Sequence, residues 1–295
     1  MKPIRKIIKK MKNKDEAVAG IVVAVMIVGL VLAVVSIIQT VYIPKWMQNR
    51  EAEHMGVVSD QFSQLKFAID SQIALKEDSP ISTSITLGSR ELGFFMSNKA
   101  FGRLSLVTDE WKYHLALKSG ETFEDTIGGL CYTSENSYFI DQEYVYEIGG
   151  VVLNQSEGSV FLVKPEISAM YNLTNHQVTL NWSIIDLQPV DEKISLNGYG
   201  TYPVRTQYEL LTDTTKNNVT SFTITTSFPS IWNNFLNTTL SDANLVKNDQ
   251  YTITKTSHDV TVTFRYFPLS NLNSVIINLE KIIIATQISP GWIES

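Results

Sequence analysis

Side chains able to do catalytic chemistry are few in this 295-residue chain, and they lie far apart in the sequence. The four histidines (His54, His114, His176 and His258) are scattered and show neither the H-E-x-x-H spacing of zinc proteases nor any other paired-ligand spacing. The single cysteine, Cys131 in "GGLCYTS", has no histidine or basic cluster nearby to activate a thiolate, so we interpret it as a small buried apolar residue. The chain also lacks G-x-S-x-G and a phosphate-binding glycine loop. We therefore expect no enzyme, no metal site and no cofactor.

A strongly basic tail precedes a long uncharged run. Residues 1–14 hold seven lysines and arginines and no acid, and residues 17–43 hold no charge. Removing the seven cations and the pair Asp15 and Glu16 from the net −6 of the chain leaves −11 on residues 44–295. Basic residues beside a span stay on the cytoplasmic side, which predicts residues 1–16 as a cytoplasmic leader and the acidic region outside. A region at −11 also argues against a nucleic-acid partner.

The uncharged run is long enough to cross a bilayer. At about 1.5 Å per residue, residues 17–43 measure roughly 40 Å as a helix, against about 30 Å of hydrocarbon. A secretory signal has an apolar core of only about 7–15 residues followed by a small-x-small cleavage site, whereas here the apolar run of residues 17–38 is 22 residues long and no A-x-A follows it before Pro44. A buried core helix is the other interpretation of such a run. The length and the flanking charges favour a transmembrane helix over residues 17–43, with membrane lipid as its partner.

Two pairs of small residues lie inside this predicted span. Gly20 with Ala24 and Gly29 with Ala33 have the small-xxx-small spacing that lets helices approach closely in lipid. The pairs are nine residues apart, so they point to opposite sides of one helix. A helix with neighbours on several sides could use both pairs, although glycine and alanine are also common in lone spans.

An amphipathic helix is predicted beyond the membrane, over residues 44–78. Tyr42 and Trp46 are of the aromatic types that settle at the headgroup level, and Pro44 between them predicts a bend. Apolar residues then recur every three or four positions (Met55, Val58, Phe62, Leu65 and Ile69). The sequence "KEDSP" ends the helix. Its apolar stripe packs either on the domain of its own chain or on another subunit.

Residues 79–295 show the pattern of an antiparallel β domain. Short runs rich in Thr, Val, Ile, Tyr and Phe alternate with polar or glycine-containing breaks. "NDQYTITKTSHDVTVTF" predicts a hairpin, and "SFPSIWNNFLNTTLSD" predicts one helix with Ile231, Phe235 and Leu240 on one side. The fold class is therefore mainly β, with an N-terminal transmembrane helix and an amphipathic helical stalk before a β-sandwich-like ectodomain.

Five N-x-S/T triplets lie in the region predicted to face outside, where N-linked glycans can be added (Asn154, Asn172, Asn181, Asn218 and Asn237). Some would arise by chance. Asn181 lies inside a predicted strand, whereas Asn218 and Asn237 have Thr at the third position and are expected in a turn or at a helix edge. We expect some of the five to be used, with Asn218 and Asn237 first.

The basic leader, the junction "DEAVAG" and the long Val/Ile/Ala/Gly helix resemble the class III signal region of archaeal type IV pilins and archaellins. The stretches "YIPKWMQNREAEHMGVVSDQFSQLKFAID" and "GGVVLNQSEGSVFLVKPEIS" are similar to uncharacterised archaeal membrane-anchored proteins with that kind of N-terminus. This resemblance implies that a prepilin peptidase cuts between residues 12 and 17 and that the exposed helices bundle with those of other pilin-like subunits. The chain departs from the family in lacking the usual glycine before the cut and in having a larger outer domain.

Two functions from different classes remain. The first is a single-pass surface protein that acts as a pilin-like subunit or minor pilin, with a structural, assembly or adhesion role. The second is a permanently anchored ectodomain that binds a ligand or an envelope partner outside any filament. Both place the protein in the cell membrane with its N-terminus in the cytoplasm and its C-terminal domain outside.

Overall fold

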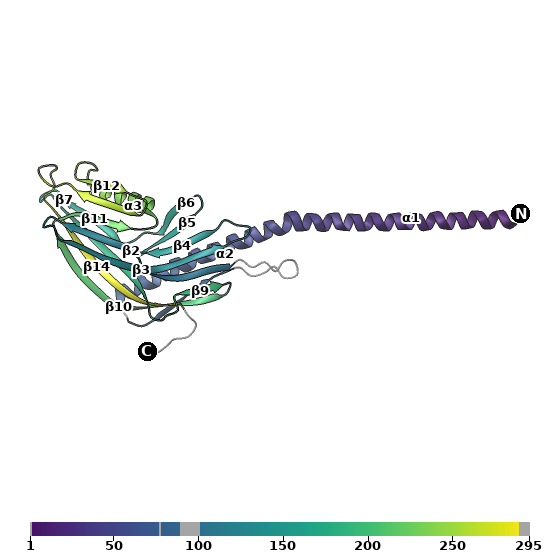
Figure 1. Cartoon of the computed structure of the whole chain (residues 1–295), viewed down its shortest axis with the longest axis horizontal. Helices are drawn as coiled ribbons and strands as arrows, with labels where there is room; N and C mark the ends of the chain where they lie inside the picture. Colours follow the sequence, from purple (N-terminus) through teal and green to yellow (C-terminus); the bar gives the residue numbers. More distant parts are fainter. Residues whose placement is uncertain (1, 77, 89–100, 289–295) are drawn as a thin grey trace.

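A computed structural model describes residues 2–76, 78–88 and 101–288, with side chains from residue 19 onward. An uninterrupted helical segment leads into a β-rich unit (Figure 1). Its parts are the α-helix α1 (Lys2–Ile37), the π-helix η1 (Ile38–Tyr42) and the α-helix α2 (Ile43–Leu75). The helix predicted over 44–78 therefore ends at Leu75, where Lys76 adopts a left-handed conformation with φ 50° and closes the last turn.

The predicted bend near Pro44 is present, and the helix continues through it. A proline has no N–H to donate and its ring crowds the carbonyl four residues before it. The wider turn of η1 lies directly before Pro44, and the Ile43 N–H bonds back to the carbonyl of Ile38. The helix axis changes direction between α1 and α2 at this place (Figure 1). The π turn thus absorbs the proline without breaking the helix.

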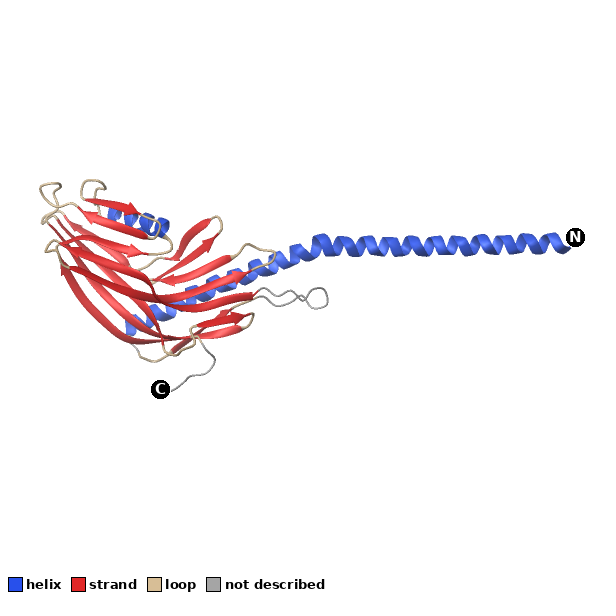
Figure 2. Cartoon of the chain, viewed as in Figure 1, coloured by secondary structure: helices blue, strands red, loops and turns tan. Residues whose placement is uncertain are grey.

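Fourteen described strands form two curled sheets, shown in red in Figure 2, and confirm the mainly β prediction. The five-stranded sheet has the order β1-β10-β14-β8-β7, and these strands are β1 (Ile81–Thr86), β10 (Thr201–Asn217), β14 (Ser274–Gln287), β8 (Gln177–Pro189) and β7 (Ile167–Asn172). The nine-stranded sheet has the order β12-β13-β11-β2-β3-β4-β5-β6, with β9 paired to β2. Its strands are β12 (Tyr251–Lys255), β13 (Asp259–Phe264), β11 (Val219–Thr225), β2 (Phe101–Leu117), β3 (Thr122–Glu135), β4 (Gln142–Glu147), β5 (Gly150–Gln155), β6 (Gly158–Val163) and β9 (Ser195–Gly198).

The pairing is antiparallel throughout these ladders except between β8 and β14. Those two strands run parallel over thirteen residue pairs, from Gln177 with Ser274 to Pro189 with Thr286. Strands that are far apart in the chain have no hairpin to force them antiparallel, and the alternating pattern of side chains is the same in either direction. The hairpin predicted from residues 248–264 is confirmed as β12 and β13.

The predicted third helix is confirmed as α3 (Pro229–Asp242), but its buried face differs from the predicted one. Trp232, Leu236 and Leu240 are buried. Ile231 and Phe235, which were expected on the same side as Leu240, are only partly buried and pack against the margin of the core. Trp232 defines the face because its ring lies inside, where its N–H has a partner.

Each end of the space between the two sheets is filled by a helix. One cluster joins α3 to residues of both sheets, among them Trp182 and Phe222. The other joins α2 to both sheets and contains the entire predicted stripe of the helix (Met55, Val58, Phe62, Leu65 and Ile69). All five stripe residues are almost wholly buried. The stripe therefore packs on the β domain of its own chain.

Buried polar side chains also hold α2 to the β domain, chiefly through backbone groups. The Glu51 carboxylate accepts N–H bonds from Ser137, Tyr138 and Phe139 at 3.1, 2.7 and 2.6 Å. At the other end of the helix, the Gln72 amide donates to the carbonyl of Thr206 at 2.8 Å and accepts from its hydroxyl at 2.9 Å. The Glu51 carboxylate and the Gln72 amide are buried away from water, so their hydrogen bonds hold the helix in one fixed position.

Replacing Glu51 with alanine should lower the free energy of unfolding by about 3 kcal/mol, because three N–H groups would lose a charged acceptor and stay away from water. Urea unfolding of the full chain in detergent micelles, followed by tryptophan fluorescence, measures this loss. Glu53→Ala is the matched control, since the Glu53 side chain is 71% exposed. Equal stability of the two variants would contradict the assigned role of Glu51.

Candidate functional site

The apolar helix is the first candidate site. Among the described residues it is the one helical segment long and apolar enough to cross a membrane, and its apolar side chains in α1 are exposed from Ala19 onward. A Cβ added at Gly20 or Gly29 would meet no atom within 4 Å. The small pairs Gly20/Ala24 and Gly29/Ala33 therefore lie on open helix surface, and no part of the described chain packs on them. Their use in helix packing stays a prediction.

The five sequon asparagines are spread over the β-rich unit and do not converge. Asn218 is exposed with φ 57°, in the tight turn between β10 and β11. Asn172 is exposed at the end of β7, and Asn181 is exposed on β8, where it accepts a bond from Asn278 at 2.8 Å. Asn154 on β5 and Asn237 inside α3 are partly buried. Asn218 is thus an exposed acceptor in a turn, and glycosylation of the five stays a prediction.

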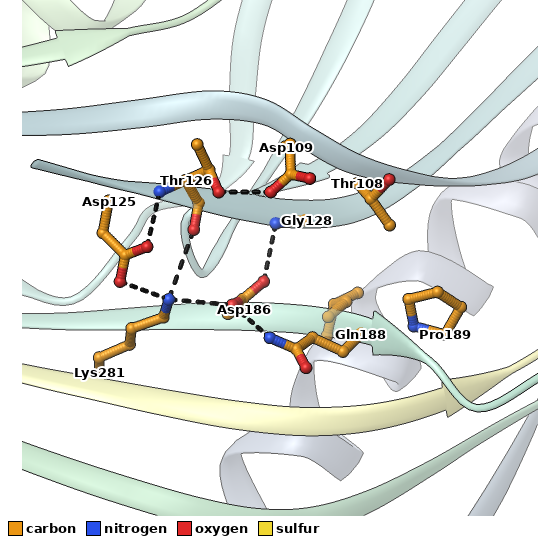
Figure 3. Close-up of a pocket in the computed structure, with 10 residues that line it drawn as sticks. Thr108, Asp109, Asp125, Thr126, Gly128, Asp186, Gln188, Pro189 and Lys281 are labelled. Carbon is orange, nitrogen blue, oxygen red and sulfur yellow. Dashed lines mark hydrogen bonds and ion pairs between the residues drawn. The ribbon is translucent and has the colours of Figure 1, made fainter.

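A polar cavity of about 270 Å³ is the second candidate site, and it lies where the two sheets meet. Figure 3 shows Lys281 reaching from β14 and Asp186 from β8 toward β3 of the other sheet. The Lys281 amine donates to Asp125 at 2.6 Å and lies 3.2 Å from the Asp186 carboxylate. Asp186 also accepts the Gly128 N–H at 2.7 Å. These bonds tie the two sheets together.

A bulge in β2 shapes the wall of this cavity. The pairing of β2 with β3 is interrupted between Val107 and Trp111, and Asp109 in the bulge has φ 59°. Asp109 accepts a hydrogen bond from the hydroxyl of Thr126, across the cavity mouth (Figure 3). Bulges commonly redirect a side chain, as here for Asp109. The two sheets also approach closely at Gly128, because a Cβ on this residue would come within 2.4 Å of the Leu187 carbonyl.

The charge state of Lys281 limits what the cavity can do. Burial alone would lower the pKa of Lys281, but its hydrogen bond to Asp125 and the charge of Asp186 outweigh that effect and raise the pKa. The amine therefore stays protonated, which does not suit a general base or a Schiff-base lysine. With three aspartates and one lysine the cluster carries −2. Such a cavity suits a small ligand rich in hydroxyls or positive charge, or it acts only as a strut between the sheets.

Sequence reasoning missed this cluster. Asp186 and Lys281 each interrupt a run of apolar residues, in "NWSIIDLQP" and "NLEKIIIA". A single charge among buried strand residues must have a partner, so Asp186 was a detectable signal, whereas Lys281 was a weaker one because the exposed Glu280 precedes it. Which partner it meets depends on the register of the parallel β8–β14 pair, where Lys281 lies opposite Ile184.

A third buried carboxylate belongs to Glu147 at the end of β4. It is fully buried and accepts bonds from the indole N–H of Trp232 at 2.5 Å and from the hydroxyl of Thr226 at 2.9 Å. The pKa of Glu147 is raised to about 7, chiefly by burial and to a smaller extent by the charges of Glu143 and Glu110, while the hydrogen bonds from Trp232 and Thr226 oppose the rise in part. Ile148 and Gly149, with φ 49° and 78°, make the turn that follows.

Cys131 on β3 is partly buried against the core, as the small apolar interpretation implies. Burial raises the pKa of its thiol far above its ordinary value, so the thiolate needed for nucleophilic attack does not form near neutral pH. Within the described residues, no group of three histidine, cysteine, aspartate or glutamate side chains could hold a metal ion. At the polar cavity, the Lys281 amine occupies the position between two carboxylates that a cation would take.

Replacing Lys281 with methionine should lower the free energy of unfolding by about 2–3 kcal/mol at pH 7, because the buried Asp186 would lose its counter-charge. Adding Asp186→Asn should restore about half of that loss. Urea unfolding of the single and double variants measures the coupling free energy between Lys281 and Asp186. Arg50→Met is the control: it removes an exposed ion pair at 3.7 Å, and we expect less than about 0.5 kcal/mol. Additive losses would show that Lys281 and Asp186 do not stabilise each other.

Glu147→Gln should remove one component of the pH dependence of stability. The folded state holds the Glu147 proton up to about pH 7, whereas the unfolded chain releases it near pH 4.5. The wild-type chain therefore loses about 3 kcal/mol of stability as pH rises through this window, and the glutamine variant does not. The difference between the two stability curves from pH 4 to 8 measures the effect, with the exposed Glu121→Gln as control. Parallel curves would contradict the assignment.

Comparison with known proteins found no match among protein-family models, curated proteins or solved structures.

Proposed function

We propose that this chain is a structural subunit of a surface assembly, of the pilin-like class, whose apolar helix packs against the same helix of other subunits. The observation that carries the proposal is the continuity of the helix from Lys2 to Leu75. Residues 19–37 of this helix are largely apolar and uncovered, and its last part lies in the core between the two sheets. A bundle of such helices would position every attached β domain without a flexible linker.

The outer side of α2 supports packing on a neighbour. Trp46, Val57, Phe67 and Leu75 are exposed, with Phe67 at 73% and Leu75 at 70%. At about 100° per residue, their spacings of 11, 10 and 8 residues place the four side chains within an arc of about 80° on one side of the helix. That side lies opposite the stripe buried in the domain. These four exposed apolar side chains are separated by polar residues, and each offers a contact to a neighbouring helix.

The charge distribution supports an orientation with the tail of residues 1–16 in the cytoplasm and the β-rich unit outside the cell membrane. The tail carries seven cations, and the region after the span carries −11. Removal of this tail by a prepilin peptidase is part of the proposal, because it would free the apolar helix from its cytoplasmic anchor. N-glycans at Asn218 and other sequons are compatible with this placement.

The second candidate function is a permanently anchored ectodomain that binds a ligand. The polar cavity between β3, β8 and β14 favours it, because a cavity lined by three aspartates and a lysine can hold a small polar molecule. The two functions differ in the fate of the tail and in the role of the outer side of α2. An anchored ectodomain needs neither cleavage nor an apolar outer stripe.

The double variant Val57→Glu/Phe67→Glu should abolish assembly while leaving the fold intact, since both side chains already face outward. Electron microscopy of expressing cells and cross-linking of the native protein measure assembly, and circular dichroism of the purified chain checks the fold. Met170→Glu/Leu210→Glu is the matched control, because it places the same charges on exposed strand positions.

Intact-mass analysis of the native protein completes this experiment. A pilin-like subunit should have lost the basic tail, with a new N-terminus between residues 12 and 17. Assembly unchanged by the α2 double variant, together with a full-length chain that retains Lys2, would overturn the proposal in favour of an anchored ectodomain.

A further inference from the structure

The edge strand β6 is open to a further strand. It ends the nine-stranded sheet and pairs with β5 alone. Among the described residues, no other backbone group bonds to the strand. Natural proteins protect such edges with charges, prolines or covering segments. On β6 the side chains of Val160 and Leu162 are instead exposed, at 53% and 36%.

A groove runs beside this edge, between β6 and α3. One part, of about 300 Å³, is lined by Val160, Phe161, Ile231 and Phe235, with polar residues at its margin. An adjoining part, of about 220 Å³, lies between the start of β6 and the start of α3, and shares Ser159 and Ile231 with the first. The groove therefore offers apolar pockets next to unpaired backbone, which is the combination that an extended peptide uses.

The walls of the groove are held firmly. The Phe161 ring meets the rings of Trp232 and Phe235 edge to face, with centroids 5.3 and 5.7 Å apart. Trp232 is itself fixed by its hydrogen bond to Glu147. The helix α3 also contacts β12, the other edge strand of the same sheet, which fixes its position relative to β6. A rigid groove loses little entropy when a ligand binds.

Two lysines at the groove indicate what kind of ligand it binds. Lys164 lines the groove, and Lys255 bonds the hydroxyl of Ser230 at its other margin, at 3.0 Å. Neither lysine forms a salt bridge within the described part of the chain. Two unpaired cations beside an apolar groove contrast with the −11 of residues 44–295. They favour a ligand with carboxylates beside its apolar side chains.

We infer that β6 and the α3 groove bind an extended segment of a second polypeptide, in which apolar and acidic side chains alternate. The peptide backbone pairs with β6, its apolar side chains enter the groove, and its carboxylates face Lys164 and Lys255. A lipid or a sugar would leave the open backbone ladder of β6 unused. This inference is independent of the assembly proposed for the apolar helix, because it involves a different surface.

The test uses the full chain in detergent micelles and a bead-bound library of capped seven-residue peptides. The four odd positions hold Val, Ile, Thr, Phe or Tyr, and the three even positions hold Glu or Thr. We expect at least tenfold greater retention of fluorescently labelled chain than on a library with Lys in place of Glu. N-methylation of two adjacent nitrogens in the best peptide should weaken binding at least tenfold, because neighbouring N–H groups point to opposite edges of a strand.

Variants of the chain locate the binding surface. Val160→Glu should weaken binding of the best peptide at least tenfold, and Lys164→Ala/Lys255→Ala about fivefold. Val190→Glu is the matched control, since Val190 is 52% exposed and lies outside the groove. Fluorescence polarisation with the labelled peptide measures each affinity.

Three outcomes would overturn the inference. One is equal retention by the acidic and basic libraries. Another is binding that survives N-methylation or Val160→Glu. The third is self-association in sedimentation experiments that Val160→Glu weakens while no peptide binds, which would assign the groove to a second copy of the chain.

Discussion

Burial of α2 between the two sheets is the contact on which the rest of the structure depends. Its apolar stripe fills one end of the core, where Met55 and Phe62 meet residues of both sheets. Removing one such side chain from a core typically costs several kcal/mol, so the β domain and α2 form one stable unit. The same helix continues into the apolar segment. The direction of that segment is therefore set by the β domain, apart from the bend at Pro44.

The buried carboxylates of this chain are stabilised in three different ways. Glu51 is held by backbone N–H groups, Asp186 by the Lys281 amine, and Glu147 by the neutral donors of Trp232 and Thr226. A cation or several N–H groups compensate a buried charge well, whereas two neutral donors do so only in part. This difference explains why the pKa of Glu147 reaches about 7. The hydrogen bond from Trp232 to Glu147 also joins α3 to the end of β4.

Three surfaces of the described chain remain open to partners, and their chemistry differs. Residues 19–37 are largely apolar on all sides, the outer side of α2 has four separate apolar side chains, and β6 offers unpaired backbone beside an apolar groove. The first suits lipid or other helices, and the second suits a neighbour held parallel to α2. The third suits an extended peptide. A surface subunit with these features would contact its neighbours through helices and keep its sheet edge for another protein.

The sequence alone determined the elements whose signal is local. The uncharged run over residues 17–43, the 3–4 spacing from Met55 to Ile69 and the hairpin over residues 251–264 each follow from hydrophobic periodicity and turn residues within a short window. Only the tertiary structure decided how distant segments meet. It paired β8 with β14 in parallel, turned Trp232 toward Glu147 and brought Lys281 between Asp125 and Asp186. Such contacts join residues about 80–160 positions apart, and a strand pattern of period two is satisfied by many pairings, so burial of the whole chain has to select among them.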